Sequence, residues 1–206
     1  MLERMDFRKL SNILSWALHP FLLPLYMMGL ILTMTLFARY PTGMKFYLAW
    51  VVTLYAVIIP VLSLAVLRSL GRLSDFRIDE RRERFLPLLI GTVCYILCGV
   101  TIAKIPSAVF LRKFMFAAAC CEAMCLAVTL RWKISLHLTG MGAAVALLVV
   151  MNVVGVGTML VPLAVAILLA GALASARLYL GCHNGAQVLA GFGGGFVVSL
   201  LAVLFL

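Results

Sequence analysis

The chain consists mainly of long apolar runs separated by short polar connections, and this pattern limits its fold more than any other feature. Each of seven runs is about as long as the roughly 20 residues that a helix needs to cross the hydrocarbon core of a bilayer. We therefore predict an all-α fold, a polytopic transmembrane helical bundle of six to seven spans, with residues 1–206 forming one membrane-embedded domain. The runs cover residues 12–37, 46–67, 85–103, 114–130, 137–154, 159–175 and 186–206.

Composition excludes the main alternatives to a membrane protein. Hydrophobic residues make up 65% of the 206 residues and charged residues 12%, and the mean hydropathy is +1.16. A soluble domain has about twice that charged fraction. Five of the six cysteines lie inside apolar runs without the paired spacing of a metal site, so we interpret them as small apolar residues rather than ligands or disulfides.

The charge balance is basic, with 17 Lys and Arg against 7 Asp and Glu. In a soluble protein such an excess would suggest nucleic acid. Here the charges lie in short loops between apolar runs, so we expect the lipid bilayer and phosphate groups as partners and no nucleic acid.

Three polar connections fall on the same side of a seven-span arrangement: residues 68–84, 131–137 and 177–183. The polar groups are thus predicted to gather at one face of the bundle. We expect localisation in a bacterial inner (cytoplasmic) membrane. The distribution of Lys and Arg between the two faces leaves open which side this face is on.

The first of these connections holds three arginines at helical spacing. Arg77 and Arg81 are four residues apart, and Arg84 follows three residues later. Such residues share one helical face, which makes the three guanidinium groups candidate ligands for a phosphate. The carboxylates interspersed among them also fit a solvated amphipathic loop helix.

The second connection places Lys133, Ser135 and His137 at alternate positions just where the chain enters the fifth run. The basic residues and Trp132 fit an interfacial flank whose side chains reach the head groups. A histidine beside a serine at the membrane boundary is not explained in that way, because ionisable groups there are costly and are often functional.

The third connection contains Arg177, then His183 six residues later and Gln187 four residues after that. If the chain is helical from His183, the imidazole and the Gln187 amide share one face and are able to hydrogen-bond. The amide oxygen would then determine the tautomer of the ring. The alternative is a structural interfacial histidine with a packing glutamine.

Together, the three connections supply cationic groups and two imidazoles, which suit phosphoester chemistry. Arginine forks neutralise and orient a phosphoryl group. One histidine attacks phosphorus and the other protonates the leaving oxygen. Because phosphoryl transfer requires mainly positioning and charge, we expect neither a metal nor another cofactor.

The ordered set resembles the signature of the type-2 phosphatidic acid phosphatase superfamily, which shares a core with vanadate haloperoxidases. That signature reads Lys, six residues, Arg-Pro; then Pro-Ser-Gly-His; then Ser-Arg, five residues, His, three residues, Asp. This chain has Arg in place of the Lys, Leu136 in place of the glycine, and Gln in place of the Asp. The matching residues are Arg77 and Arg84, then Ser135 and His137, then Arg177, His183 and Gln187.

The resemblance implies a membrane phosphatase in which His183 is the nucleophile, His137 the general acid and Gln187 the residue that orients the nucleophile. Expected substrates are a lipid phosphate, such as phosphatidic acid, or an isoprenoid diphosphate. The alternative is a non-catalytic lipid-phosphate-binding relative, because an amide cannot stabilise an imidazolium as a carboxylate does. The expected phosphate ligands are Arg77, Arg84, Arg177 and Ser135 by resemblance, with Arg81 and Lys133 added by position.

Two further observations limit the possibilities. The chain has no Asp after Asp79 and no pair of the DxxxD kind, which argues against an intramembrane prenyltransferase that holds a diphosphate through magnesium. Glu122 lies inside an apolar run. An intramembrane carboxylate is a functional candidate by default, and a structural glutamate explains it equally well.

Overall fold

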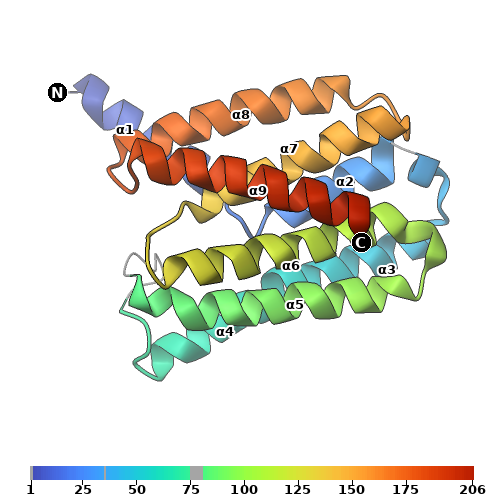
Figure 1. The fold of residues 1–206 in the computed structure, drawn as a ribbon, viewed down its shortest axis with the longest axis horizontal. Helices are drawn as coiled ribbons and strands as arrows, with labels where there is room; N and C mark the ends of the chain where they lie inside the picture. Colours follow the sequence, from blue (N-terminus) through green and yellow to red (C-terminus); the bar gives the residue numbers. More distant parts are fainter. Residues whose placement is uncertain (1, 35, 75–80) are drawn as a thin grey trace.

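The computed structural model describes residues 2–34, 36–74 and 81–206, and every regular element in this part of the chain is a helix, without strands. The all-α prediction is confirmed. The helices lie side by side along one long axis (Figure 1). In chain order the elements are α1 (Leu2–Ala17), α2 (Leu23–Met34), the 3-10 turn η1 (Leu36–Arg39), α3 (Thr42–Thr53), the π-helical η2 (Leu54–Ile58), α4 (Ile59–Ser69), η3 (Arg82–Arg84), α5 (Phe85–Ala103), η4 (Pro106–Ala108), α6 (Val109–Thr129), α7 (Leu136–Val154), α8 (Leu160–Tyr179) and α9 (Gly185–Phe205).

Within the described residues, five helical segments are long and apolar enough to span a membrane, so the predicted count of six to seven spans is not confirmed. α6 has 21 residues, but Arg112, Lys113 and Glu122 reduce its apolar character. The lateral surface is strongly apolar: Leu168 is 72% and Leu189 74% exposed. Such surfaces belong in lipid, and the protein is an integral membrane protein. The five segments are Thr42–Ser69, Arg82–Ala103, Leu136–Val154, Leu160–Tyr179 and Gly185–Phe205.

The first apolar run was predicted as one span over residues 12–37, and the structure corrects this. α1 ends at Ala17 and α2 begins at Leu23. Pro20 has no amide hydrogen and disfavours the helical conformation at His19 before it. The carbonyl of His19 instead accepts hydrogen bonds from Leu22 N and Leu23 N, at 2.8 and 3.3 Å. With 12 residues, α2 is too short to cross a bilayer alone.

The centre of the bundle is α7, most of which is buried. α9 packs directly on it, because Gly195 lies against the backbone of Thr139 and Gly191 against that of Ser135. Small residues at these two positions, four apart on one face of α9, allow this close approach. One helical turn earlier, the carbonyl of Gln187 accepts a hydrogen bond from Ser135 N at 3.4 Å.

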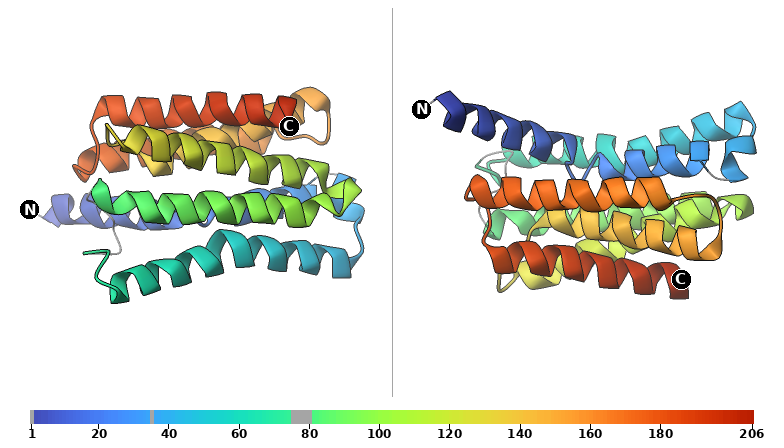
Figure 2. Two further views of the ribbon diagram at one scale, coloured as in Figure 1. Left: turned by 60° about the horizontal axis from the view of Figure 1, so that its bottom comes forward. Right: turned by 90° about the horizontal axis from the view of Figure 1, so that it is seen from above.

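The predicted clustering of polar connections at one end of the bundle is also confirmed. Figure 1 shows that α6 joins α7 and α8 joins α9 at the end where α4 stops and α5 starts. The corner between α1 and α2 lies part-way along the bundle (Figure 2, right). It reaches the start of α7 through His19, whose ring centroid is 5.2 Å from that of His137.

Candidate functional site

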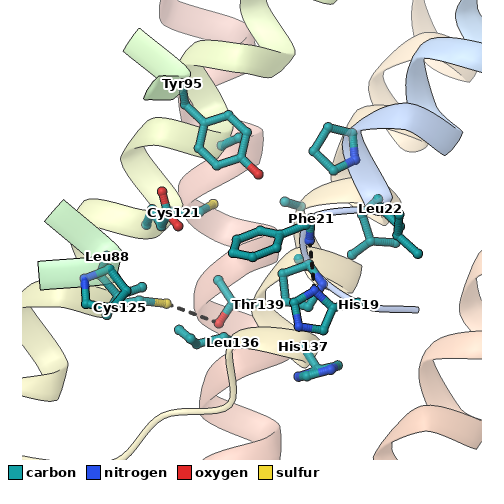
Figure 3. Close-up of a pocket in the computed structure, with 18 of the residues that line it drawn as sticks. His19, Phe21, Leu22, Leu88, Tyr95, Cys121, Cys125, Leu136, His137 and Thr139 are labelled. Carbon is teal, nitrogen blue, oxygen red and sulfur yellow. Dashed lines mark hydrogen bonds between the residues drawn. The ribbon is translucent and has the colours of Figure 1, made fainter. Parts of the chain in front are cut away.

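A cavity of about 420 Å³ opens at this polar end and continues inward between apolar walls. Figure 3 shows His19 and His137 beside each other at one side of it, with Tyr95 farther along the bundle. The cavity thus has a polar outer part and a mainly apolar inner part. The imidazole and guanidinium groups that line the outer part belong to His19, Arg84, His137, Arg177 and His183.

His183 lies in the short connection between α8 and α9 and is only 7% exposed. Its Nδ1 is 3.1 Å from Oε1 of Gln187. The same oxygen accepts a hydrogen bond from the backbone N–H of Asn184, at 3.2 Å. The Asn184 side chain in turn accepts Gln187 N at 2.9 Å, which completes a capping box at the start of α9. Because the backbone N–H of Asn184 donates to this side-chain atom of Gln187, the atom is the amide oxygen and not the amide nitrogen. An oxygen only accepts, so Nδ1 of His183 carries the proton and Nε2 keeps its lone pair.

The surroundings of His183 keep the ring neutral. Burial lowers its pKa from 6.5 to about 4, and the positive charges of Arg177, Arg84 and Lys133 act in the same direction. The hydrogen bond with Gln187 opposes them and raises the pKa. At neutral pH, His183 therefore presents the unprotonated Nε2 that a nucleophile requires.

His137 lies in the first turn of α7, where its Nε2 is 3.1 Å from the carbonyl oxygen of Ser15 in α1. A carbonyl only accepts hydrogen bonds, so Nε2 carries the proton and Nδ1 is the atom able to take up another. The ring stands edge-on to His19, with ring centroids 5.2 Å apart.

Two arginines contribute positive charge to the cavity. Arg84 is 5% exposed and donates from Nη1 to the carbonyl of Ile134 at 3.2 Å. This bond ties the start of α5 to the connection before α7. Arg177, near the end of α8, is half-buried, and its Nε has no hydrogen-bond partner in the described part of the chain. A phosphate oxygen in the cavity is the kind of acceptor that this group lacks.

Among the described residues, three other predicted ligands, Ser135, Lys133 and Arg81, do not line the cavity. Ser135 is completely buried. Its backbone N–H donates a hydrogen bond to the carbonyl of Gln187, and this bond helps to position α9. Lys133 is half-buried and acts on His183 through its charge. Arg81 is exposed to solvent. Arg77 lies outside the described residues.

His19 is the residue that sequence reasoning missed as part of this site. Its Nδ1 accepts a hydrogen bond from the backbone N–H of Phe21, at 3.3 Å. In the neutral ring the proton is therefore on Nε2, which is the donor. Burial, and secondarily the charge of Arg177, lowers its pKa from 6.5 to about 4. The available signal was the His-Pro pair in the middle of an apolar run, since such a pair breaks a helix and frees a histidine from its face.

The arrangement suits an amphipathic anion. Neutral imidazoles and two guanidinium groups surround the outer part of the cavity, and the inner part accepts an apolar chain. Comparisons of the chain with models of protein families, with curated proteins and with solved structures found no significant match.

Proposed function

We propose that this protein is an integral-membrane phosphatase of the cytoplasmic membrane, a divergent member of the type-2 phosphatidic acid phosphatase superfamily. It hydrolyses a lipid phosphate or an isoprenoid diphosphate through a phosphohistidine intermediate, without a metal. One observation carries the proposal: the bond between His183 Nδ1 and Gln187 leaves Nε2 unprotonated on a ring that lines a cavity with Arg84 and Arg177.

The substrate phosphate binds between the two guanidinium groups, and Nε2–H of His19 donates to a non-bridging oxygen. The Nε2 lone pair of His183 attacks phosphorus, and the bond from phosphorus to the lipid oxygen breaks. His137 carries a proton on Nδ1, taken up from the bound phosphate, and donates it to that leaving oxygen. Water then attacks the phosphohistidine, gives a proton to His137, and releases inorganic phosphate with His183 restored.

Gln187 favours the second candidate, a non-catalytic protein that binds lipid phosphates. Attack by His183 places positive charge on its ring, and an amide oxygen stabilises that charge less than a carboxylate. Such a protein would bind phosphorylated head groups through Arg84 and Arg177 without turnover.

The test is phosphate release by the detergent-purified protein from phosphatidic acid and from an isoprenoid diphosphate, with and without a chelator and vanadate. Activity that survives the chelator, is blocked by vanadate and is lost in His183→Ala supports the hydrolase. Arg131→Ala is the matched control, because Arg131 is an exposed cation at the same end of the bundle. Full activity in His183→Ala would refute the mechanism. Binding that depends on Arg177, without any phosphate release, would favour the second candidate.

The intermediate offers an independent test. Substrate labelled in the reacting phosphate should transfer label to the protein, and the label should be stable in alkali and labile in acid, as expected for a phosphorus–nitrogen bond. Label on any residue other than His183 would contradict the proposed nucleophile.

A further inference from the structure

The apolar inner part of the cavity contains two polar side chains that the proposed chemistry does not use. Tyr95 of α5 and Glu122 of α6 both line it. Oε2 of Glu122 is buried without a hydrogen-bond partner in the described part of the chain. In Figure 3 the Tyr95 ring projects from α5 into the cavity, on the side away from His137.

The two groups are held at neighbouring positions. A side chain at Gly91 would collide with the Glu122 carboxylate, so the carboxyl group lies directly over this glycine. Tyr95 is four residues farther along α5 and therefore lies on the same helical face. The surrounding walls are apolar and include Leu88 and Phe114.

An unpaired carboxyl group in such a place is costly. A buried polar group without a hydrogen bond is destabilised by about 1–3 kcal/mol, and a carboxyl in an intramembrane cavity is usually functional. Replacing it with an apolar residue would suit a chamber for a plain hydrocarbon chain better. The unpaired oxygen is therefore best explained by a ligand that brings the missing partner.

We infer that Tyr95 and Glu122 form a second subsite in the cavity, which binds a hydroxyl or amide group carried on the chain of the lipid ligand. Gly91 is seven residues from Arg84, or about 10 Å along the axis of a helix. The phosphate end and this chain group are therefore about that far apart. The position of the phosphate rests on the proposed function, whereas the subsite is inferred only from the placement of Tyr95 and Glu122 in the cavity.

The experiment uses phosphate-free probes, so that it is independent of catalysis. Displacement of a fluorescent alkyl probe from the purified protein is measured for 1-decanol and for decane, and the ratio of the two dissociation constants gives the preference for the hydroxyl. We expect Glu122→Leu to reduce this preference about five- to tenfold relative to the unaltered protein, the equivalent of one hydrogen bond. Glu122→Gln should preserve most of it.

Tyr95→Phe removes only a hydroxyl and should also reduce the preference. Its matched control is Tyr55→Phe, since Tyr55 is a partly buried tyrosine outside the cavity lining. Thermal unfolding of each variant checks the fold.

An unchanged preference in folded Glu122→Leu would overturn the inference and show that the glutamate has only a structural role. If Glu122→Leu does not fold, the preference for decanol is measured in Tyr95→Phe instead, and an unchanged preference there would likewise overturn the inference. Hydrolysis of octadecyl phosphate with no preference for decanol would leave the proposed function intact and remove the subsite. A preference for decanol without any phosphate release would support the subsite and contradict the proposed phosphatase activity.

Discussion

The Gln187→Glu substitution tests the electrostatics of the site most directly. Oε1 of Gln187 accepts hydrogen bonds from His183 Nδ1 at 3.1 Å and from Asn184 N at 3.2 Å. Glutamate has the same length as glutamine, so one carboxylate oxygen is able to accept both bonds. The substitution therefore adds a negative charge next to the imidazole with little change in shape.

The expected effect is an increase in the pKa of His183. In the unaltered protein, burial and neighbouring cations lower this pKa to about 4. An opposite charge in contact typically shifts a pKa by about 1–3 units toward the charged form, or about 1.4–4 kcal/mol. We expect the pKa of His183 in Gln187→Glu to rise to about 5–7.

Acylation by diethyl pyrocarbonate measures this pKa, because the reagent attacks only the neutral imidazole. The rate at His183, followed by peptide mass spectrometry from pH 3.5 to 8, should reach half its maximum near pH 4 in the unaltered protein. The midpoint should lie higher in Gln187→Glu. In Gln187→Leu it should not rise, because the bond that raises the pKa is lost. A folded Gln187→Glu protein with an unshifted midpoint would refute the hydrogen-bonded pairing.

The pKa of His183 is about 6.5 in an unfolded chain and about 4 in the folded protein, so the unfolded state binds more protons between these values. The contribution of His183 to stability should be full above pH 6.5 and fall by about 3 kcal/mol toward pH 4. His19, whose pKa is also lowered to about 4, adds a fall of its own, so thermal unfolding should show a smaller total fall in His183→Gln than in the unaltered protein. Gly195→Leu should destabilise the protein by at least about 1–3 kcal/mol, because the new side chain meets the backbone of Thr139. Gly193→Ala, where no atom lies within 4 Å, should be neutral or stabilising, and equal melting temperatures for the two variants would contradict the packing of α9 on α7. His19→Ala should reduce kcat/KM about tenfold or more through loss of a phosphate donor, with partial rescue in His19→Gln. An unchanged KM and kcat would remove His19 from the site.

Local chemistry explains which parts of the site could be predicted. The pairing of His183 with Gln187 depends on a spacing of four residues at the start of a helix, and such contacts are encoded within a few positions of the chain. The packing of Gly191 and Gly195 against α7 follows from small residues on one helix face. The partner of His137 could not be found in this way, because Ser15 is 122 residues away in sequence.

The pattern of apolar runs by itself determined the helical class, the membrane environment and the gathering of polar connections at one end, since bilayer thickness and backbone hydrogen bonding leave a long apolar run few alternatives. Only the tertiary structure decided which polar groups share the cavity. It brought His19 in through the break at Pro20, tied Arg84 to Ile134, and left Arg81 in solvent. These outcomes depend on helix rotation and on contacts between distant segments, which residue spacing along the chain does not specify.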